Sequence, residues 1–163
     1  MQQKNERHCT GIFLYKFNTE INQYEIALIQ SQKFRHHSTG SLLWTIPGGR
    51  IEPEDQGSTI DERILACARR EVREELGIEL EYALYYPELN SQKTGAEIGY
   101  QDPETMFYFY ECTARVASDQ FHVGQEVERV EWFPLNQLPE PMTEDICALL
   151  HTLATHTEQY FKK

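Results

Sequence analysis

The sequence predicts one domain of the α/β class, in which strands and helices pack as a sandwich. Its 163 residues are the length of one domain and suffice to bury a core. Apolar residues make up 40% of the chain and aromatic residues 12%, which excludes a disordered composition. Strand-like stretches flank one helical stretch, and a second helical stretch ends the chain. We therefore expect residues 1–163 to form a single domain.

Apolar and aromatic residues gather in short stretches between polar turns, the pattern of β-strands. Two stretches near the N-terminus, 9–17 and 24–31, are joined by the turn "NTEINQ" and predict two neighbouring strands. A short strand at 44–46 is stopped by the proline and two glycines at 47–49. Polar residues 87–103 predict a long connection, which often carries function. Further strands are predicted at 79–86, 104–114 and 126–133.

The spacing of apolar residues becomes helical after Asp61. Gly77 follows in the position where a left-handed glycine commonly ends a helix. A second apolar face predicts a C-terminal helix at about 143–161, after two prolines. The first helix places five apolar residues within about 120° of its circumference, Ile64, Leu65, Ala68, Val72 and Leu76.

Acidic residues outnumber basic ones by 26 to 15, which gives a net charge of −11 and a pI near 5.0. Nucleic acids bind basic surfaces, so this charge argues against them as partners. No apolar run approaches the ~20 residues of a membrane span, and the polar N-terminus does not resemble a signal peptide. Four cysteines without a C-x-x-C pair predict free thiols. We expect a cytoplasmic protein without a membrane partner.

Three glutamates, Glu71, Glu74 and Glu75, crowd the end of the first helix within about 100° of its circumference. Like charges at i,i+4 cost about 0.2–0.5 kcal/mol, and each acid there opposes the helix dipole by about 0.3–1 kcal/mol. Arg70 offsets part of this cost. A hard divalent cation would remove the repulsion and take carboxylate oxygens as ligands. On spacing alone, both a metal site and a solvated helix end are open interpretations.

Together with its flanks, this segment resembles the Nudix box, G-x5-E-x7-R-E-U-x-E-E-x-G-U, where U is aliphatic. The matching residues are the glycines at 48–49, Glu62, and "REVREELGI" at 70–78, so that the box spans 48–78. Every fixed position from Glu62 onward matches. Upstream, twelve residues instead of five separate Gly49 from Glu62, an insertion that a surface loop tolerates at small entropic cost.

The resemblance implies a Nudix fold, an α/β/α sandwich around a mixed β-sheet. It also implies hydrolysis of a pyrophosphate bond in a nucleoside diphosphate-linked substrate, with Mg²⁺ or Mn²⁺. In such enzymes the glutamates matching Glu71, Glu74 and Glu75 hold the metal. A glycine carbonyl, here Gly49, joins them, and the arginine matching Arg70 orients the carboxylates.

By the same resemblance, a metal-bound water with a lowered pKa attacks phosphorus in line. Its proton goes either to Glu71 or to a glutamate outside the box. Glu126 is our outside candidate, because it lies six residues before Trp132, where Nudix relatives often carry an acid. The candidate catalytic residues are therefore Glu71, Glu74, Glu75, Arg70 and Glu126.

Candidate substrate contacts lie in three further places. Gly48 and Arg50 belong to the glycine loop. Arg35, His36 and His37 lie in the loop before Trp44, from which they could approach phosphates, although a charged and polar loop of this kind is more often solvated. We expect contacts with the base from Tyr100, in the long connection, and from an aromatic residue of the following strand, Phe107, Tyr108 or Phe109, of which we take Phe107.

Two substrate classes stay open, nucleoside triphosphates and dinucleotides or nucleotide sugars. Pro87 follows the box too early for the proline typical of ADP-ribose hydrolases, and Tyr100 too late for the tyrosine of dinucleoside-polyphosphate hydrolases. The alternative function is a catalytically silent Nudix-like module that senses a nucleotide and regulates a partner. Metal-assisted isomerisation is a third possible function, which the complete Nudix box favours less than hydrolysis. Nudix relatives are frequently dimers, so a homodimer is also open.

Overall fold

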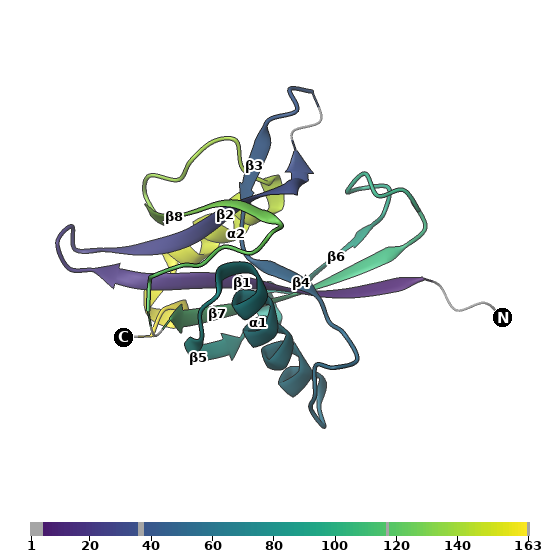
Figure 1. Cartoon of the computed structure of the whole chain (residues 1–163), viewed down its shortest axis with the longest axis horizontal. Helices are drawn as coiled ribbons and strands as arrows, with labels where there is room; N and C mark the ends of the chain where they lie inside the picture. The colour runs from purple at the N-terminus through teal and green to yellow at the C-terminus, as the bar shows by residue number, and fades with distance from the viewer. Residues whose placement is uncertain (1–4, 36–37, 117, 163) are drawn as a thin grey trace.

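The structure is a computed structural model that describes residues 5–35, 38–116 and 118–162. Its strands form one sheet in which five follow in the order β3-β2-β1-β7-β5, while β4, β6 and β8 pair with β1, β7 and β2 (Figure 1). The strands are β1 (Glu6–Asn18), β2 (Gln23–Arg35), β3 (Leu42–Thr45), β4 (Gly48–Arg50), β5 (Leu80–Tyr85), β6 (Ser91–Thr94), β7 (Met106–Val116) and β8 (Val127–Pro134).

The sheet is mixed, because β1 and β7 run parallel while the other pairs are antiparallel. β1 pairs with β2 through residues 15–18 only. Further back along β1, residues 9–11 pair with β4 instead. The glycine segment is therefore a strand of the sheet itself, placed where β1 and β2 separate.

Helices cover both faces of the sheet. Successive residues of β1 point to opposite faces, so Ile12 and Leu14 pack in the cluster that contains the apolar face of α1 (Ile60–Leu76). Phe13 and Tyr15 pack in a second cluster with Leu150 and Leu153 of α2 (Glu144–Thr155). Figure 1 shows α1 in front of the sheet and α2 behind it. This arrangement confirms the expected α/β/α sandwich.

α1 begins and ends at residues with clear capping roles. The Thr59 hydroxyl accepts a hydrogen bond from the Glu62 N–H at 3.2 Å, which satisfies a free donor of the first turn. Gly77 has φ 66°, and its N–H donates to the Arg73 carbonyl at 3.0 Å. A left-handed residue at this position is favoured when it is glycine. The predicted stop at Gly77 is therefore confirmed, and the helix begins at Ile60, one residue before the predicted Asp61.

Gly48 and Gly49, which were predicted only to stop a strand, belong to strand β4, and two further segments differ from the prediction. The C-terminal helix is not continuous over 143–161, because α2 ends at Thr155 and a short α3 (Thr157–Tyr160) follows. His156 between them has non-helical dihedrals, φ −129° and ψ 47°. The connection 87–103 contains a 3₁₀ turn (Pro87–Leu89) and the edge strand β6, whose polar sequence "SQKT" gives no strand signal. No helix in the described ranges is long and apolar enough to cross a membrane.

Candidate active site

The three glutamates of α1 share a cavity of about 240 Å³ with the segment that leads into β8. This segment is bound to the end of α1, where the Gly124 N–H donates to the Glu75 carbonyl at 2.9 Å. The structure therefore brings Glu126 to the box glutamates, although 51 positions separate it from Glu75 (126 − 75). The lining residues are Glu71, Glu74, Glu75, Gly124, Gln125, Glu126 and Val127.

β4 lies so close to its neighbours that a side chain at Gly49 would meet the Glu71 carboxylate of α1, and one at Gly48 would meet the backbone of β1. A Cβ on Gly49 would lie 2.3 Å from Glu71 Oε1, and a Cβ on Gly48 would lie 2.3 Å from the Thr10 carbonyl oxygen. The absence of side chains lets the Gly48 N–H donate to Glu75 Oε1 at 2.9 Å. Both predicted glycines therefore lie directly beside the box carboxylates.

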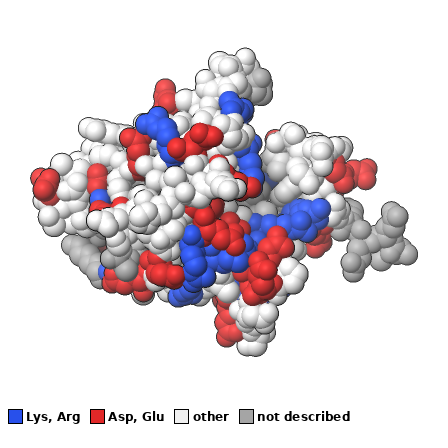
Figure 2. Space-filling model, viewed as in Figure 1, with Lys and Arg blue, Asp and Glu red and all other residues white. Residues whose placement is uncertain are grey.

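The cavity concentrates negative charge that burial makes unfavourable. Burial raises the pKa of Glu75 to about 8; the Gly48 N–H opposes this shift, and the negative charges of Glu71 and Glu126 add to it. Burial also raises the pKa of Glu71, although Arg70 opposes this shift. Figure 2 shows acidic and basic side chains interleaved over this front face of the molecule. A cation at these carboxylates would relieve their repulsion.

Arg70 connects two of these glutamates to the loop that precedes the helix. Its Nη1 donates to Glu71 Oε1 at 3.0 Å and to Glu74 Oε2 at 3.1 Å. Its other face is held by Asp55, with Nε–Oδ1 and Nη2–Oδ2 distances of 2.8 and 3.0 Å. Nη2 also donates to the Arg50 carbonyl at 2.9 Å. The guanidinium is therefore in a position to orient both carboxylates.

Asp55 is a site residue that the sequence interpretation missed. Burial alone would raise the pKa of its carboxyl, but hydrogen bonds from Arg70 and from the Glu52 N–H lower it. Five residues separate Gly49 from Asp55, which is the box spacing with aspartate in place of glutamate. That spacing was the available signal. The seven additional residues therefore follow Asp55, and they form the loop and first turns that lead into α1.

Glu62, the residue that we matched to the first acid of the box, lies away from the other glutamates. It is exposed, and its carboxylate accepts hydrogen bonds from the Ser58 N–H at 2.7 Å and the Ser58 hydroxyl at 3.0 Å. These bonds lower the pKa of Glu62. Glu62 thus closes the N-terminal end of α1, while Asp55 takes the place beside Arg70.

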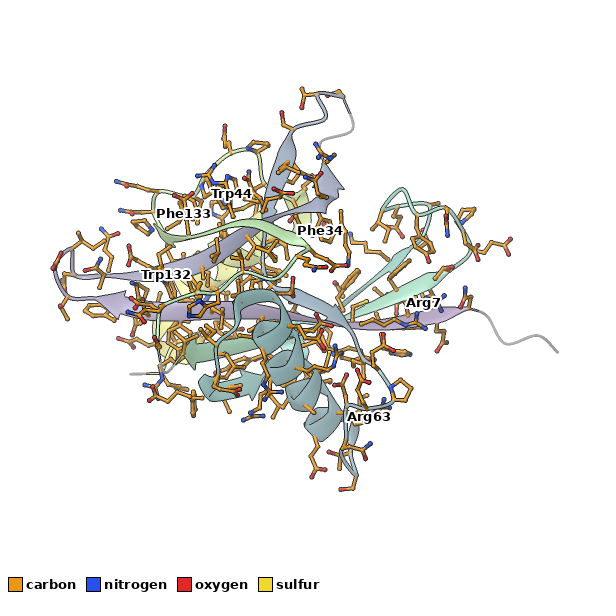
Figure 3. The ribbon with its side chains drawn as sticks, viewed as in Figure 1. Arg7, Phe34, Trp44, Arg63, Trp132 and Phe133 are labelled. Atoms are coloured by element: carbon orange, nitrogen blue, oxygen red, sulfur yellow. The ribbon has the colours of Figure 1, made fainter. Side chains whose placement is uncertain are left out.

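Arg63 is a second missed residue, and it holds the same turn as Arg70. Its Nε donates to the Asp55 carbonyl at 3.0 Å and its Nη2 to the Glu52 carbonyl at 3.2 Å. In Figure 3 its side chain extends from the start of α1 toward this turn. Residues seven apart lie on one face of a helix. Arg63 and Arg70 therefore contact the Glu52–Asp55 turn from the same face of α1, two helical turns apart.

Lys33 of β2 forms an ion pair with Glu126, one of the residues that line the cavity. Its Nζ lies 2.9 Å from Glu126 Oε2, and this hydrogen bond raises the pKa of Lys33 despite partial burial. Glu75 and Glu71 raise it further by their charge. Nothing in the local sequence distinguishes Lys33 from other exposed lysines, because its place depends on the pairing of β2 with β8.

The donor set suits a hard divalent cation, since carboxylate oxygens are the ligands that Mg²⁺ and Mn²⁺ prefer. The carboxylates are not converged, however. Glu71 and Glu74 bond to Arg70, and Glu75 bonds to the Gly48 N–H. Within the described ranges, no group of three histidine, cysteine, aspartate or glutamate side chains meets at a single point. A bound cation would therefore compete with Arg70 for carboxylate oxygens.

The other predicted contacts lie in two separate places. Tyr100 meets the ring of Phe107 edge-on, with centroids 4.9 Å apart. Arg50 of β4 pairs with Cys9 of β1. Arg35 instead closes the β2–β3 connection, donating to the Gly40 carbonyl at 2.8 Å and to the Gln32 side chain. His36 and His37 lie outside the described residues.

Comparisons with known proteins point to one family. The chain is 27% identical over 125 residues to the ADPR responsive transcriptional repressor NtrR of Acinetobacter baylyi, a match that covers 74% of this chain and 42% of that protein. The chain thus spans about two fifths of the length of this curated relative.

Two solved structures share the fold. A MutT NUDIX hydrolase of Burkholderia pseudomallei superposes with a TM-score of 0.66 at 23% identity, over 91% of this chain and 98% of that one. The NUDIX domain of Shewanella oneidensis NrtR, solved with ADP ribose, also gives 0.66, at 17% identity, over 96% of this chain and 90% of that one. The profile of the NUDIX domain matches residues 7–152, so the chain belongs to the NUDIX domain family.

Proposed function

We propose that this chain hydrolyses a pyrophosphate bond in a nucleoside diphosphate-linked substrate, with Mg²⁺ or Mn²⁺ held by Glu71, Glu74, Glu75 and the Gly49 carbonyl. The observation that carries the proposal is the shared cavity of the three box glutamates and Glu126, whose charge a cation would compensate. When bound, the cation would neutralise charge on the phosphate and lower the pKa of a water molecule. Family membership supports this reaction class.

The chain's own residues fix the geometry of the site. Arg70 holds Glu71 and Glu74 from one side, while the Gly48 N–H holds Glu75 from the other. Asp55 and Arg63 in turn limit the positions that Arg70 can adopt, because they anchor the turn on which it rests. Positioning of this kind lowers a barrier because the entropy of alignment is lost during folding and not during reaction.

Lys33 is our candidate for binding a phosphate oxygen. Its ion pair with Glu126 is exposed on both sides, at 63% and 65%, so exchange of partners costs little. When Lys33 turns to a phosphate, the Glu126 carboxylate is released from this ion pair and can accept a hydrogen bond from a water molecule. We therefore assign the proton of the attacking water to Glu126, because Glu71 is one of the proposed metal ligands.

Arg50, Tyr100 and Phe107 are proposed to contact the nucleoside part of the substrate. Arg50 pairs with Cys9, and Cys9 pairs with Phe109, so their side chains emerge on the same face as Phe107. Tyr100 packs on Phe107 from the connection after β6. Arg35 remains a candidate for contact with the substrate only if it leaves the Gly40 carbonyl.

The direct test is a nucleotide panel with Mg²⁺, covering nucleoside triphosphates, dinucleoside polyphosphates, ADP-ribose and nucleotide sugars. We expect release of a nucleoside monophosphate from at least one class. Glu75→Gln should lower the rate by roughly 100-fold or more without loss of folding. Glu79→Gln, an exposed glutamate just beyond the same helix, serves as the matched control. Complete inactivity toward the panel contradicts the proposal.

The sensor function is a second candidate, because the Acinetobacter baylyi relative is described as an ADPR responsive repressor and the Shewanella oneidensis domain was solved with ADP ribose. A sensor would bind ADP-ribose without turnover. Calorimetric titration with ADP-ribose in Mg²⁺, followed by chromatography of the ligand, separates the two functions. Recovery of intact ADP-ribose after tight binding favours the sensor, whereas recovery of AMP favours the hydrolase.

A further inference from the structure

Glu111, in the middle of β7, carries a buried carboxyl oxygen that has no hydrogen-bond partner among the described residues. The residue is 3% exposed, and no group in the described ranges bonds to its Oε2. Burial raises the pKa of Glu111 to about 8. A buried polar group left unpaired costs about 1–3 kcal/mol, so its presence in a folded protein needs a physical reason.

The carboxyl lies on the same face of the sheet as a cluster of aromatic rings. Tyr110 and Cys112 pack against the α1 cluster, so the alternate residues Phe107, Phe109 and Glu111 face the other way. The rings of Phe107 and Phe109 lie nearly parallel, at 11°, with centroids 6.2 Å apart. Phe107 is 8% exposed, whereas Phe109 is partly exposed, so the ring of Phe109 offers the apolar surface on which a nucleobase can stack.

The strand pairing connects this face to the glutamate cavity. Glu111 pairs with Gly11 of β1, and Gly11 pairs with Gly48 of β4. A Cβ on Gly11 would lie 2.3 Å from Glu111 Oε2, so the carboxyl occupies the space above that glycine. Next in this row is Gly48, whose N–H holds Glu75. The row therefore runs from the unpaired carboxyl to a carboxylate of the cavity across two residues without side chains.

We propose that Glu111 is a specificity-determining residue that recognises the exocyclic amino group of a nucleobase stacked on the Phe107–Phe109 face. The amino N–H would donate to Oε2, the atom without a partner. The position of the base relative to the cavity rests on the proposed pyrophosphate function, whereas the contact with Glu111 does not. A site built around a buried polar group discriminates strongly, because a ligand that lacks the matching group leaves it unpaired.

The test uses ligands that contain no pyrophosphate bond, so that it is independent of hydrolysis. Calorimetric titration with AMP, GMP, CMP and UMP identifies the base that binds most tightly. That ligand is then compared with its counterpart lacking the amino group, which is purine riboside monophosphate for AMP, IMP for GMP and 2-pyrimidinone riboside monophosphate for CMP. UMP has no exocyclic amino group, so tightest binding of UMP would contradict the inference. We expect the wild-type protein to lose about 10-fold or more in affinity when the amino group is absent.

In Glu111→Leu the amino-bearing and amino-free ligands should bind equally and weakly, because the partner of the amino group is gone. Ribose 5-phosphate, which has no base, should bind alike to both proteins. Thermal unfolding supplies the second readout, since removal of an unpaired buried carboxyl should raise the melting temperature. Glu104→Gln, an exposed glutamate just before β7, should change neither affinity nor stability.

Equal loss of affinity for ribose 5-phosphate in Glu111→Leu would overturn the inference, because it would indicate general damage to the site. An unchanged preference for the amino group in that variant would also overturn it. So would equal binding of the amino-bearing and amino-free ligands by the wild-type protein. Failure of the hydrolysis panel together with a preserved amino preference would reject the proposed reaction and support the role of Glu111.

Discussion

Asp55 and Arg70 form a two-point ion pair at the base of the site, with N–O distances of 2.8 and 3.0 Å. The side chain of Asp55 is 2% exposed and that of Arg70 is 15% exposed. Such fork-to-fork geometry fixes the plane of the guanidinium as well as its position. Two of the three box glutamates therefore take their orientation from a residue that precedes the helix by one loop.

Removal of the Asp55 charge should damage both stability and activity. Asp55→Asn leaves the Arg70 guanidinium partly uncompensated, and breaking a buried pair costs about 3–5 kcal/mol. We expect a lower urea midpoint and a rate reduced by an order of magnitude or more. Asp61→Asn, an exposed acid in the first turn of the same helix, is the control. Equal effects of the two substitutions would refute a special role for Asp55.

Arg63 should act through position and not through contact with substrate. Arg63→Ala removes two hydrogen bonds from the Glu52–Asp55 turn. We expect weaker binding of Mn²⁺, measured by electron paramagnetic resonance, with unchanged helical circular dichroism. Arg63→Lys should recover only part of this affinity, because one ammonium cannot reproduce a two-point contact. Arg69→Ala removes the charge of an exposed arginine of α1 and is the control. If Arg69→Ala weakens Mn²⁺ binding as much as Arg63→Ala does, the prediction is wrong.

Lys33 should contribute to substrate binding more than to folding. Lys33→Met keeps the aliphatic stem and removes the charge, so the KM for an active nucleotide should rise about 10-fold, which corresponds to about 1.4 kcal/mol. Thermal stability should change little, because exposed ion pairs contribute about 0–1 kcal/mol. Steady-state kinetics at several ionic strengths check this expectation. A lower kcat with an unchanged KM would instead place Lys33 in the chemical step.

Glu111 should make stability depend on pH. Because burial raises its pKa to about 8 in the folded state, from an ordinary value of 4.5, the folded protein keeps a proton that the unfolded chain releases. Stability should therefore fall as pH rises from about 5 to about 8, by at most ~1.4 kcal/mol per pH unit. Glu111→Gln should become more stable than the wild type across this range, which urea denaturation at several pH values measures. A stability difference between Glu111→Gln and the wild type that does not change with pH would contradict the raised pKa of Glu111.

The sequence predicts the elements whose signal is local. The five apolar residues of α1 share one face and Gly77 follows them, so this helix was identified with its correct end, whereas its N-cap Thr59 was not identified. The core strands are apolar on both faces and were also recognised. β6 was not, because an edge strand of polar residues is defined by its partner β7 and not by its own composition.

The site was predictable only where a motif is contiguous. Glu71, Glu74 and Glu75 follow one another on a single helix, whereas Lys33 depends on the strand order for its place at the cavity. Asp55 had a sequence signal, its distance from Gly49, but the complete match beginning at Glu62 hid it. Glu111 had no sequence signal, because its place opposite Gly11 depends on the pairing of β7 with β1.

The incorporation of Gly48–Arg50 into the sheet has a consequence for how a ligand enters. A segment whose main chain is hydrogen-bonded to β1 cannot swing aside as a flap, so admission and release of a phosphate chain must rely on rotating side chains and on peripheral turns. If this segment is rigid, the amide hydrogens of Gly48 and Gly49 should exchange slowly with solvent even in the ligand-free protein.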